Sequence, residues 1–279
     1  MHYVTEFLAQ FDGAPLLQSL QCMHNFPSTP HSCRSLRLPA LRQLKVINGC
    51  LECLSLPGSL TSLYLSYLPC DGVQLRTILR CCPLLHTLVL ESYGPQTGDL
   101  TYPFTIVEST SVKQFAVELA TTSASRRPKI ARLSFPSLEY LELGEETTSD
   151  RLQQLFPPSS TMFSSLHTLH LHDYFGVHNA LPFLLSLKAM RHLILADVNL
   201  KSMNWPVDAW PDLKRIEVVD SPWFCSEDGT EISKLADFTR ERQKISPDFC
   251  TVVIDEEWCN QYPEFELLPL GFSEKRLLM

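Results

Sequence analysis

The sequence has little positive charge. It contains 23 lysines and arginines against 31 aspartates and glutamates, so its 279 residues carry a net charge of −8. A surface that binds nucleic acid or an anionic membrane needs clustered positive charge. The chain also lacks an apolar run near the roughly 18 residues of a membrane span, and residues 1–6 do not open a secretion signal. We expect a cytoplasmic or nuclear protein that binds neither nucleic acid nor membranes.

Cysteine and glycine are scarce too, with ten residues of each. Without a secretion signal the cysteines are expected to stay reduced, mostly as core residues. The sequence contains no Gly-x-Ser-x-Gly nucleophile motif, no phosphate-binding loop and no Gly-x-Gly-x-x-Gly dinucleotide motif. We therefore expect no enzymatic activity and no cofactor.

Leucine, by contrast, is abundant, with 46 residues, and many of them fall into a repeated L-x-x-L-x-L pattern. Seven of the nine steps between successive copies are 23 to 28 residues long, a period typical of leucine-rich repeats. The fourth and sixth positions share one face of a strand, so each copy predicts a short strand. The copies begin at Leu17, Leu41, Leu60, Leu85, Val112, Leu138, Leu166, Met190, Leu213 and, more weakly, Phe249.

Between the strands, helical patterns predict short helices over residues 74–82, 150–156 and 181–187, and a longer one over 231–244. The fold expected is an α/β leucine-rich-repeat solenoid, a horseshoe with a parallel concave sheet and short convex helices. We assign residues 1–16 to an N-terminal cap or partial repeat, 17–255 to nine or ten repeats, and 256–279 to a C-terminal cap or tail. Within 41–65 a second triplet, Leu51, Leu54 and Leu56, competes for the register.

Three segments resemble a known family. The run from Cys82 to Leu90, CPLLHTLVL, resembles the C-P-x-L-x-x-L-x-L pattern of F-box leucine-rich-repeat proteins, and residues 135–143 and 210–218 resemble its P-x-L variant. The irregular repeat lengths are most similar to the divergent repeats of fungal F-box proteins. The resemblance implies the substrate-recognition part of a ubiquitin ligase, in which the repeats hold a protein substrate and an F-box holds a Skp-type adaptor.

Residues 1–16 contain neither the Leu-Pro-x-Glu-like segment nor the apolar helical run of an F-box. Binding of a Skp-type adaptor is therefore expected only if an F-box lies upstream. The alternative is a stand-alone scaffold or inhibitor with no link to a ligase.

The third, fifth and seventh positions of each copy point away from the core and should line the concave face. Ten parallel strands would span about 45 Å, which suits a protein or peptide partner bound by a monomer. We expect the fifth positions to be exposed, including Tyr64, Val89, Ile194 and Val253. The residues proposed to bind a partner are Lys45, Tyr64, Val89, Tyr140, Glu142, His170, His172, His192, Ile194, Arg215 and Glu217.

A metal site can also be drawn on this face. His170 and His172 share one face of a strand, and His192 lies diagonally across on the next repeat, with Asp173 nearby. No fixed metal motif is present, however, and a polar surface or a partner contact explains the histidines equally well. We predict no metal.

Overall fold

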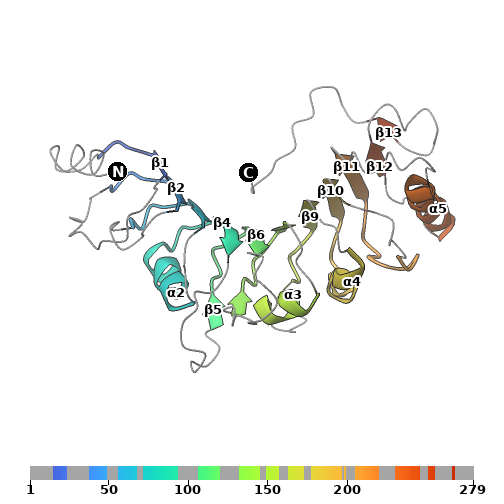
Figure 1. Cartoon of the computed structure of the whole chain (residues 1–279), viewed down its shortest axis with the longest axis horizontal. Helices are drawn as coiled ribbons and strands as arrows, with labels where there is room; N and C mark the ends of the chain where they lie inside the picture. Colours follow the sequence, from blue (N-terminus) through green and yellow to red (C-terminus); the bar gives the residue numbers. More distant parts are fainter. Residues whose placement is uncertain are drawn as a thin grey trace. The chain divides into compact units, whose positions relative to one another are not determined.

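The computed structural model describes part of the chain, and these residues belong to two compact units, Met1–Phe135 and Pro136–Met279. Each unit is a parallel-sheet solenoid (Figure 1). The described residues are 15–23, 38–48, 56–67, 72–93, 106–119, 132–144, 149–156, 163–172, 177–196, 198, 205–219, 230–245, 251–254 and 266–267.

The described residues of the first unit form five parallel strands in chain order, one helix and a separate pair of short parallel strands. The pair lies in segments that the sequence pattern leaves as loops. The five strands are β1 (Ser19–Met23), β2 (Gln43–Ile47), β3 (Ser62–Ser66), β4 (Thr87–Tyr93) and β6 (Gln114–Leu119). The helix is α2 (Gly72–Cys81), and the separate pair is β5 (Ile106–Glu108) with β7 (Arg132–Ser134).

The second unit also consists of parallel strands, and three of the connections between them contain a described helix. Its strands are β8 (Tyr140–Leu143), β9 (Thr168–His172), β10 (His192–Ala196), β11 (Arg215–Val219), β12 (Thr251–Ile254) and β13 (Glu266–Leu267). Its helices are α3 (Ser149–Leu155), α4 (Val177–Ser186) and α5 (Thr230–Ile245). The pair of residues in β13 extends the sheet beyond β12, within the segment expected to be a cap or tail.

All ten predicted strands are present, and the copies that start at Leu41 and Leu60 are the ones that form β2 and β3. Equivalent positions pair across the strands: Leu44 lies opposite Leu63, and Leu193 lies opposite Ile216. The core explains this register, because a slip of one residue would turn the apolar set to the other face. Leu63, Leu88, Leu141 and Leu169 are fully buried.

Within the described residues, a turn closed by a backbone hydrogen bond extends the repeat by three residues before β2, β3, β4, β9, β10 and β11. The backbone N–H of Leu85 donates to the Cys82 carbonyl at 3.1 Å, and that of Leu213 donates to the Trp210 carbonyl at 3.0 Å. The first residue of the turn is often a large buried one, such as Phe135 or Trp210, both fully buried. The repeat unit is therefore longer than the leucine pattern alone indicates.

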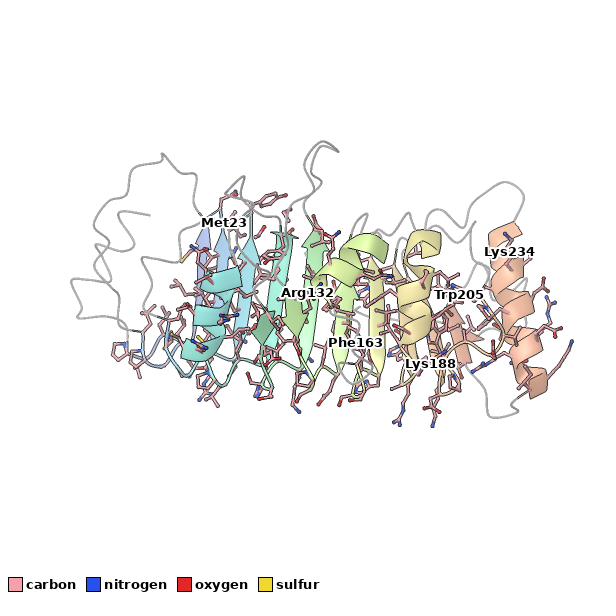
Figure 2. The ribbon with its side chains drawn as sticks, turned by 90° about the horizontal axis from the view of Figure 1, so that it is seen from below. Met23, Arg132, Phe163, Lys188, Trp205 and Lys234 are labelled. Atoms are coloured by element: carbon pink, nitrogen blue, oxygen red, sulfur yellow. The ribbon has the colours of Figure 1, made fainter. Side chains whose placement is uncertain are left out.

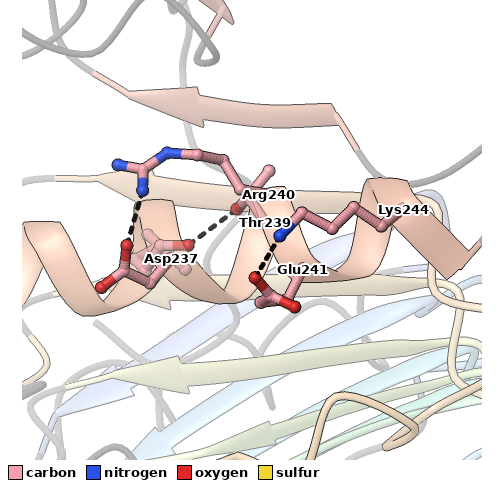
Figure 3. Close-up of polar contacts among 6 residues, drawn as sticks. Asp237, Thr239, Arg240, Glu241 and Lys244 are labelled. Carbon is pink, nitrogen blue, oxygen red and sulfur yellow. Dashed lines mark hydrogen bonds and ion pairs between the residues drawn. The ribbon is translucent and has the colours of Figure 1, made fainter.

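The four helices confirm the predicted ones. The first, α2, ends before Pro83, which cannot continue a helix, whereas α4 begins four residues before the predicted start and contains Pro182. On α5 the exposed cations are paired within the helix: Arg240 Nη1 lies 2.6 Å from Asp237 Oδ1, and Lys244 Nζ lies 2.5 Å from Glu241 Oε1 (Figure 3). None of the described helices is long and apolar enough to cross a membrane.

Candidate functional site

In each unit the helices lie against one face of the sheet, and we call the opposite face the open face (Figure 2). Its side chains form columns that run across the strands. The first, central and third columns contain the third, fifth and seventh positions of the repeats. These columns hold every residue proposed from the sequence as a partner contact.

The register of the columns is as predicted in both units, because paired strands place equivalent positions side by side. The first column is Ser19, Gln43, Ser62, Thr87 and Gln114 in the first unit, and Tyr140, Thr168, His192, Arg215 and Thr251 in the second. The central column is Gln21, Lys45, Tyr64, Val89 and Ala116 in the first unit, and Glu142, His170, Ile194, Glu217 and Val253 in the second.

The expected exposure of the central column is wrong. Tyr64 keeps 8% of its surface accessible, Ile194 7%, and Val89 and Val253 less. Parallel strands lie about 4.8 Å apart, so the central side chains from Tyr64 to Val253 are enclosed by their neighbours in the column and by the columns on either side, whereas Gln21 is exposed and Lys45 is half-buried. The first column is half-buried or exposed throughout, so a partner can reach it along its whole length.

In the second unit, three predicted residues form a buried hydrogen-bonded cluster. The Tyr140 hydroxyl lies 2.8 Å from Glu142 Oε2 and 2.8 Å from His170 Nδ1. His170 Nδ1 lies 3.5 Å from the same carboxylate oxygen, and the side chains of Glu142 and His170 are fully buried. Tyr140 itself is half-buried at the accessible column.

The proton arrangement of this cluster follows from its donors. The Tyr140 hydroxyl has one proton, which it donates to the Glu142 carboxylate. If the Glu142 carboxylate is ionised, it only accepts, and His170 Nδ1 then carries a hydrogen and donates it to the Tyr140 oxygen. Because a buried carboxylate is costly unless it is hydrogen-bonded, the cluster fixes the position of the Tyr140 ring. Its role is to hold an accessible side chain in place.

A second cluster, two strands away, has the same design. Arg215 Nε donates to Glu217 Oε1 at 2.5 Å, and His192 Nε2 lies 3.3 Å from the same oxygen. The angle at His192 is not that of a hydrogen bond, so this contact is electrostatic. The Glu217 side chain is 5% accessible, whereas those of His192 and Arg215 are 29% and 39% accessible.

The pKa of Glu217 reports the balance in that cluster. Burial raises the pKa, but the contact with His192 and the hydrogen bond and positive charge of Arg215 outweigh it, so the pKa is lowered. Glu217 is therefore ionised at neutral pH, and it orients Arg215 at the accessible column.

The first unit uses different partners. The Tyr64 hydroxyl donates to Glu91 in the third column, and Lys45 Nζ lies 4.0 Å from the centre of the Tyr64 ring, in a cation–π contact. Burial, followed by the hydrogen bond to Glu91 and the charges of Glu91 and Glu118, raises the pKa of Tyr64. In the first column, Thr87 Oγ1 donates to Gln114 Oε1 at 3.1 Å. This network contains no buried carboxylate of the central column.

The structure does not bring the histidines together around a common point. His170 Nδ1 contacts Tyr140 and Glu142, and His192 faces Glu217. His172 is half-buried in the third column, and its ring centre lies 6.3 Å from that of His170. Asp173 lies outside the described residues. Within the part of the chain that the structure describes, no group of three His, Cys, Asp or Glu side chains could hold a metal ion.

Sequence reasoning missed Glu91 and the residue that follows it. Ser92 has a positive φ of 50°, and Asn48 and Tyr67 occupy the same eighth position of their repeats with φ of 52° and 51°. This left-handed residue follows the last residue of β2 and of β3, whereas in β4 it lies inside the strand, at the register shift between Leu90 and Tyr93. Asn48 was a usable signal, because asparagine tolerates this conformation, whereas tyrosine and serine gave none.

Comparison with known protein families finds no match for this chain, and comparison with curated proteins finds none either.

Proposed function

We propose that the chain is a protein-binding leucine-rich-repeat horseshoe whose accessible first columns hold a protein partner. One observation carries this proposal: equivalent polar side chains align across consecutive strands and stay half-buried or exposed, while the central column beside them is buried from Tyr64 to Val253. Such a row offers contacts spaced about 4.8 Å apart, which an extended or folded protein surface can match.

The second unit provides the better anchors. Tyrosine and arginine are the residues that most often dominate interface energies, and Tyr140 and Arg215 both stand in its first column. Buried carboxylates hold both side chains in place. A side chain that is already ordered loses less conformational entropy on binding.

For the cellular role, we propose the substrate-recognition part of a ubiquitin ligase of the Skp, cullin and F-box type, acting in the cytoplasm or nucleus. The support is the resemblance of residues 82–90, 135–143 and 210–218 to F-box leucine-rich-repeat proteins. The alternative is a stand-alone scaffold or inhibitor that uses the same columns. Co-purification of a Skp-type adaptor and a cullin favours the ligase, and other partners alone favour the scaffold.

The test is affinity purification of the chain from a eukaryotic lysate, with mass spectrometry of the proteins that co-purify. Two variants add a bulky cation to the first column: Thr87→Arg in the first unit and Thr168→Arg in the second. Gln243→Arg adds the same charge on the exposed side of α5 and serves as the control.

We expect Thr168→Arg to reduce capture of specific partners by at least about tenfold, which corresponds to a loss of 1.4 kcal/mol. Gln243→Arg should leave capture unchanged. A set of partners that is insensitive to both first-column variants would overturn the proposal, since the open face would then not be the binding surface.

A further inference from the structure

Three exposed cations stand at the strand-start edge of the second unit, outside the columns described above. Arg191 and Lys214 occupy the second position of their repeats, directly before β10 and β11, and Lys188 lies in the turn before Arg191. We call Lys188, Arg191 and Lys214 the basic row. Figure 2 shows Lys188 at the edge where the strands begin.

Backbone hydrogen bonds place Arg191 and Lys214 on adjacent strands. The N–H of Lys214 donates to the Arg191 carbonyl at 2.8 Å, and the N–H of Arg191 donates to the His167 carbonyl at 2.9 Å. His167, which is exposed, continues the row by one strand. Adjacent parallel strands are about 4.8 Å apart, so the distance across the strands from His167 to Lys214 is about 10 Å.

The cations of the basic row have no side-chain hydrogen bond or ion pair within the part of the chain that the structure describes. Asp208 and Asp212 lie in the segment before β11, and neither forms an ion pair with them. On α5, in contrast, Arg240 and Lys244 are each paired with a carboxylate. Like charges on neighbouring positions of a sheet destabilise it, so binding an anion would relieve a cost that α5 does not carry.

We propose that the basic row binds an acidic segment of a protein partner, through carboxylates spaced along an extended chain. This inference rests on the proposed function and names the chemistry of the partner. The same edge lies directly beside His192 and Arg215 of the first column, so one partner can contact both surfaces.

The geometry favours a line of carboxylates. Alternate residues of an extended segment are about 6.6 Å apart on the same side. Two acidic side chains therefore cover most of the 10 Å between His167 and Lys214. The net charge of −8 repels any polyanion at long range, so the oligonucleotide control below distinguishes a nucleic acid from an acidic peptide.

The experiment measures binding of a fluorescein-labelled peptide of alternating Glu and Gly to the purified full chain, by fluorescence anisotropy at low and high salt. The same peptide with Gln in place of Glu is one control, and a single-stranded oligonucleotide of equal charge is another. Arg191→Glu/Lys214→Glu removes the row. Arg42→Glu/Arg80→Glu reverses two exposed cations of the first unit and changes the net charge equally, from −8 to −12.

We expect the Glu peptide to bind in a salt-dependent manner, the Gln peptide to bind at least about tenfold more weakly, and the Arg191→Glu/Lys214→Glu variant to weaken binding of the Glu peptide by about tenfold. The matched double variant should have little effect. An equal loss in both double variants, tighter binding of the oligonucleotide, or no peptide binding at low salt would each overturn the inference. None of these results touches the Thr168→Arg test, so the two proposals can fail separately.

Discussion

The open faces of the two units share one register but differ in what the central column buries. In the first unit Tyr64, Val89 and Ala116 follow one another, and none carries a charge at neutral pH. In the second unit the same column contains Glu142, His170 and Glu217, all with at most 4% of their surface accessible. The buried part of the central column is therefore uncharged in the first unit, where Lys45 is only half-buried, and ionisable in the second.

This difference determines which columns are joined by side-chain hydrogen bonds. A buried ionisable group needs partners, and in the second unit these come from the first column: Tyr140 for Glu142, and Arg215 for Glu217. In the first unit Tyr64 turns instead to Glu91 of the third column. Accessible side chains of the second unit are thus held in place by its buried carboxylates.

The largest effect is expected where both units are alike, at the buried leucines on the core side of the strands. Leu63→Asp and Leu141→Asp each bury a carboxylate among fully buried leucines, which should cost at least about 4 kcal/mol. Amide hydrogen exchange, read separately for the strands of each unit, should show loss of protection in the unit that carries the substitution. Full protection in either variant would contradict the assignment of these positions to the core.

Val89→Glu places in the first unit the kind of side chain that the second unit carries at Glu142. The neighbours of Val89 in the column are Tyr64, whose hydroxyl is engaged by Glu91, and Ala116. Without a donor for the new carboxylate, we expect a loss of about 3 kcal/mol in the free energy of unfolding. Denaturant unfolding measures it, and Val89→Ile is the apolar control. A loss as small as that of the control would mean that the first unit tolerates buried charge equally well.

Glu217→Gln tests the ionised cluster through pH. The folded-state pKa of Glu217 is lowered below its ordinary value of 4.5, so its contribution is complete above that value and lost as the pH falls through the folded pKa. At pH 7 we expect the variant to be about 2 kcal/mol less stable than the wild type. Well below pH 4.5 the two proteins should unfold at similar denaturant concentrations.

The matched control for that experiment is Glu91→Gln in the first unit, because Glu91 is half-buried and accepts from an uncharged tyrosine. At pH 7 the free energy of unfolding of Glu91→Gln should differ less from that of the wild type than the free energy of Glu217→Gln does. A pH-independent difference for Glu217→Gln would show that the amide loses packing rather than a charge interaction.

The strands and their register could be predicted from sequence because one leucine pattern fixes both. Leu63 and Leu65 mark the buried face of a strand, and their equivalents in the next repeat pair with them. The burial of Tyr64 and Ile194 could not be read in this way, because it depends on the spacing of neighbouring strands and on side chains from three repeats. The strand β13 is too short to show any periodicity.

Some of the residues that contact the site could not be predicted from the sequence either. Glu91 follows a strand and looks like a solvated glutamate in the sequence, and only the pairing of β3 with β4 brings it to Tyr64. The basic row was missed because Arg191 and Lys214 lie 23 residues apart, at a position that the leucine pattern leaves unspecified. Charge aligned by a repeat becomes visible only when the second positions of successive copies are compared.

The smallest expected effects come from removing a single hydroxyl group in each unit. Tyr64→Phe removes a hydroxyl with one carboxylate partner, Glu91, which is half-buried and can bind water. Tyr140→Phe removes a hydroxyl that joins two fully buried groups, Glu142 and His170. We expect losses of about 1 kcal/mol and about 2 kcal/mol, respectively, in denaturant unfolding, since an unsatisfied buried group costs more than a lost exposed hydrogen bond. Equal losses would mean that the Tyr140 cluster is no more dependent on its hydroxyl than the first unit is, and the coupling between its central and first columns would have to come from packing alone.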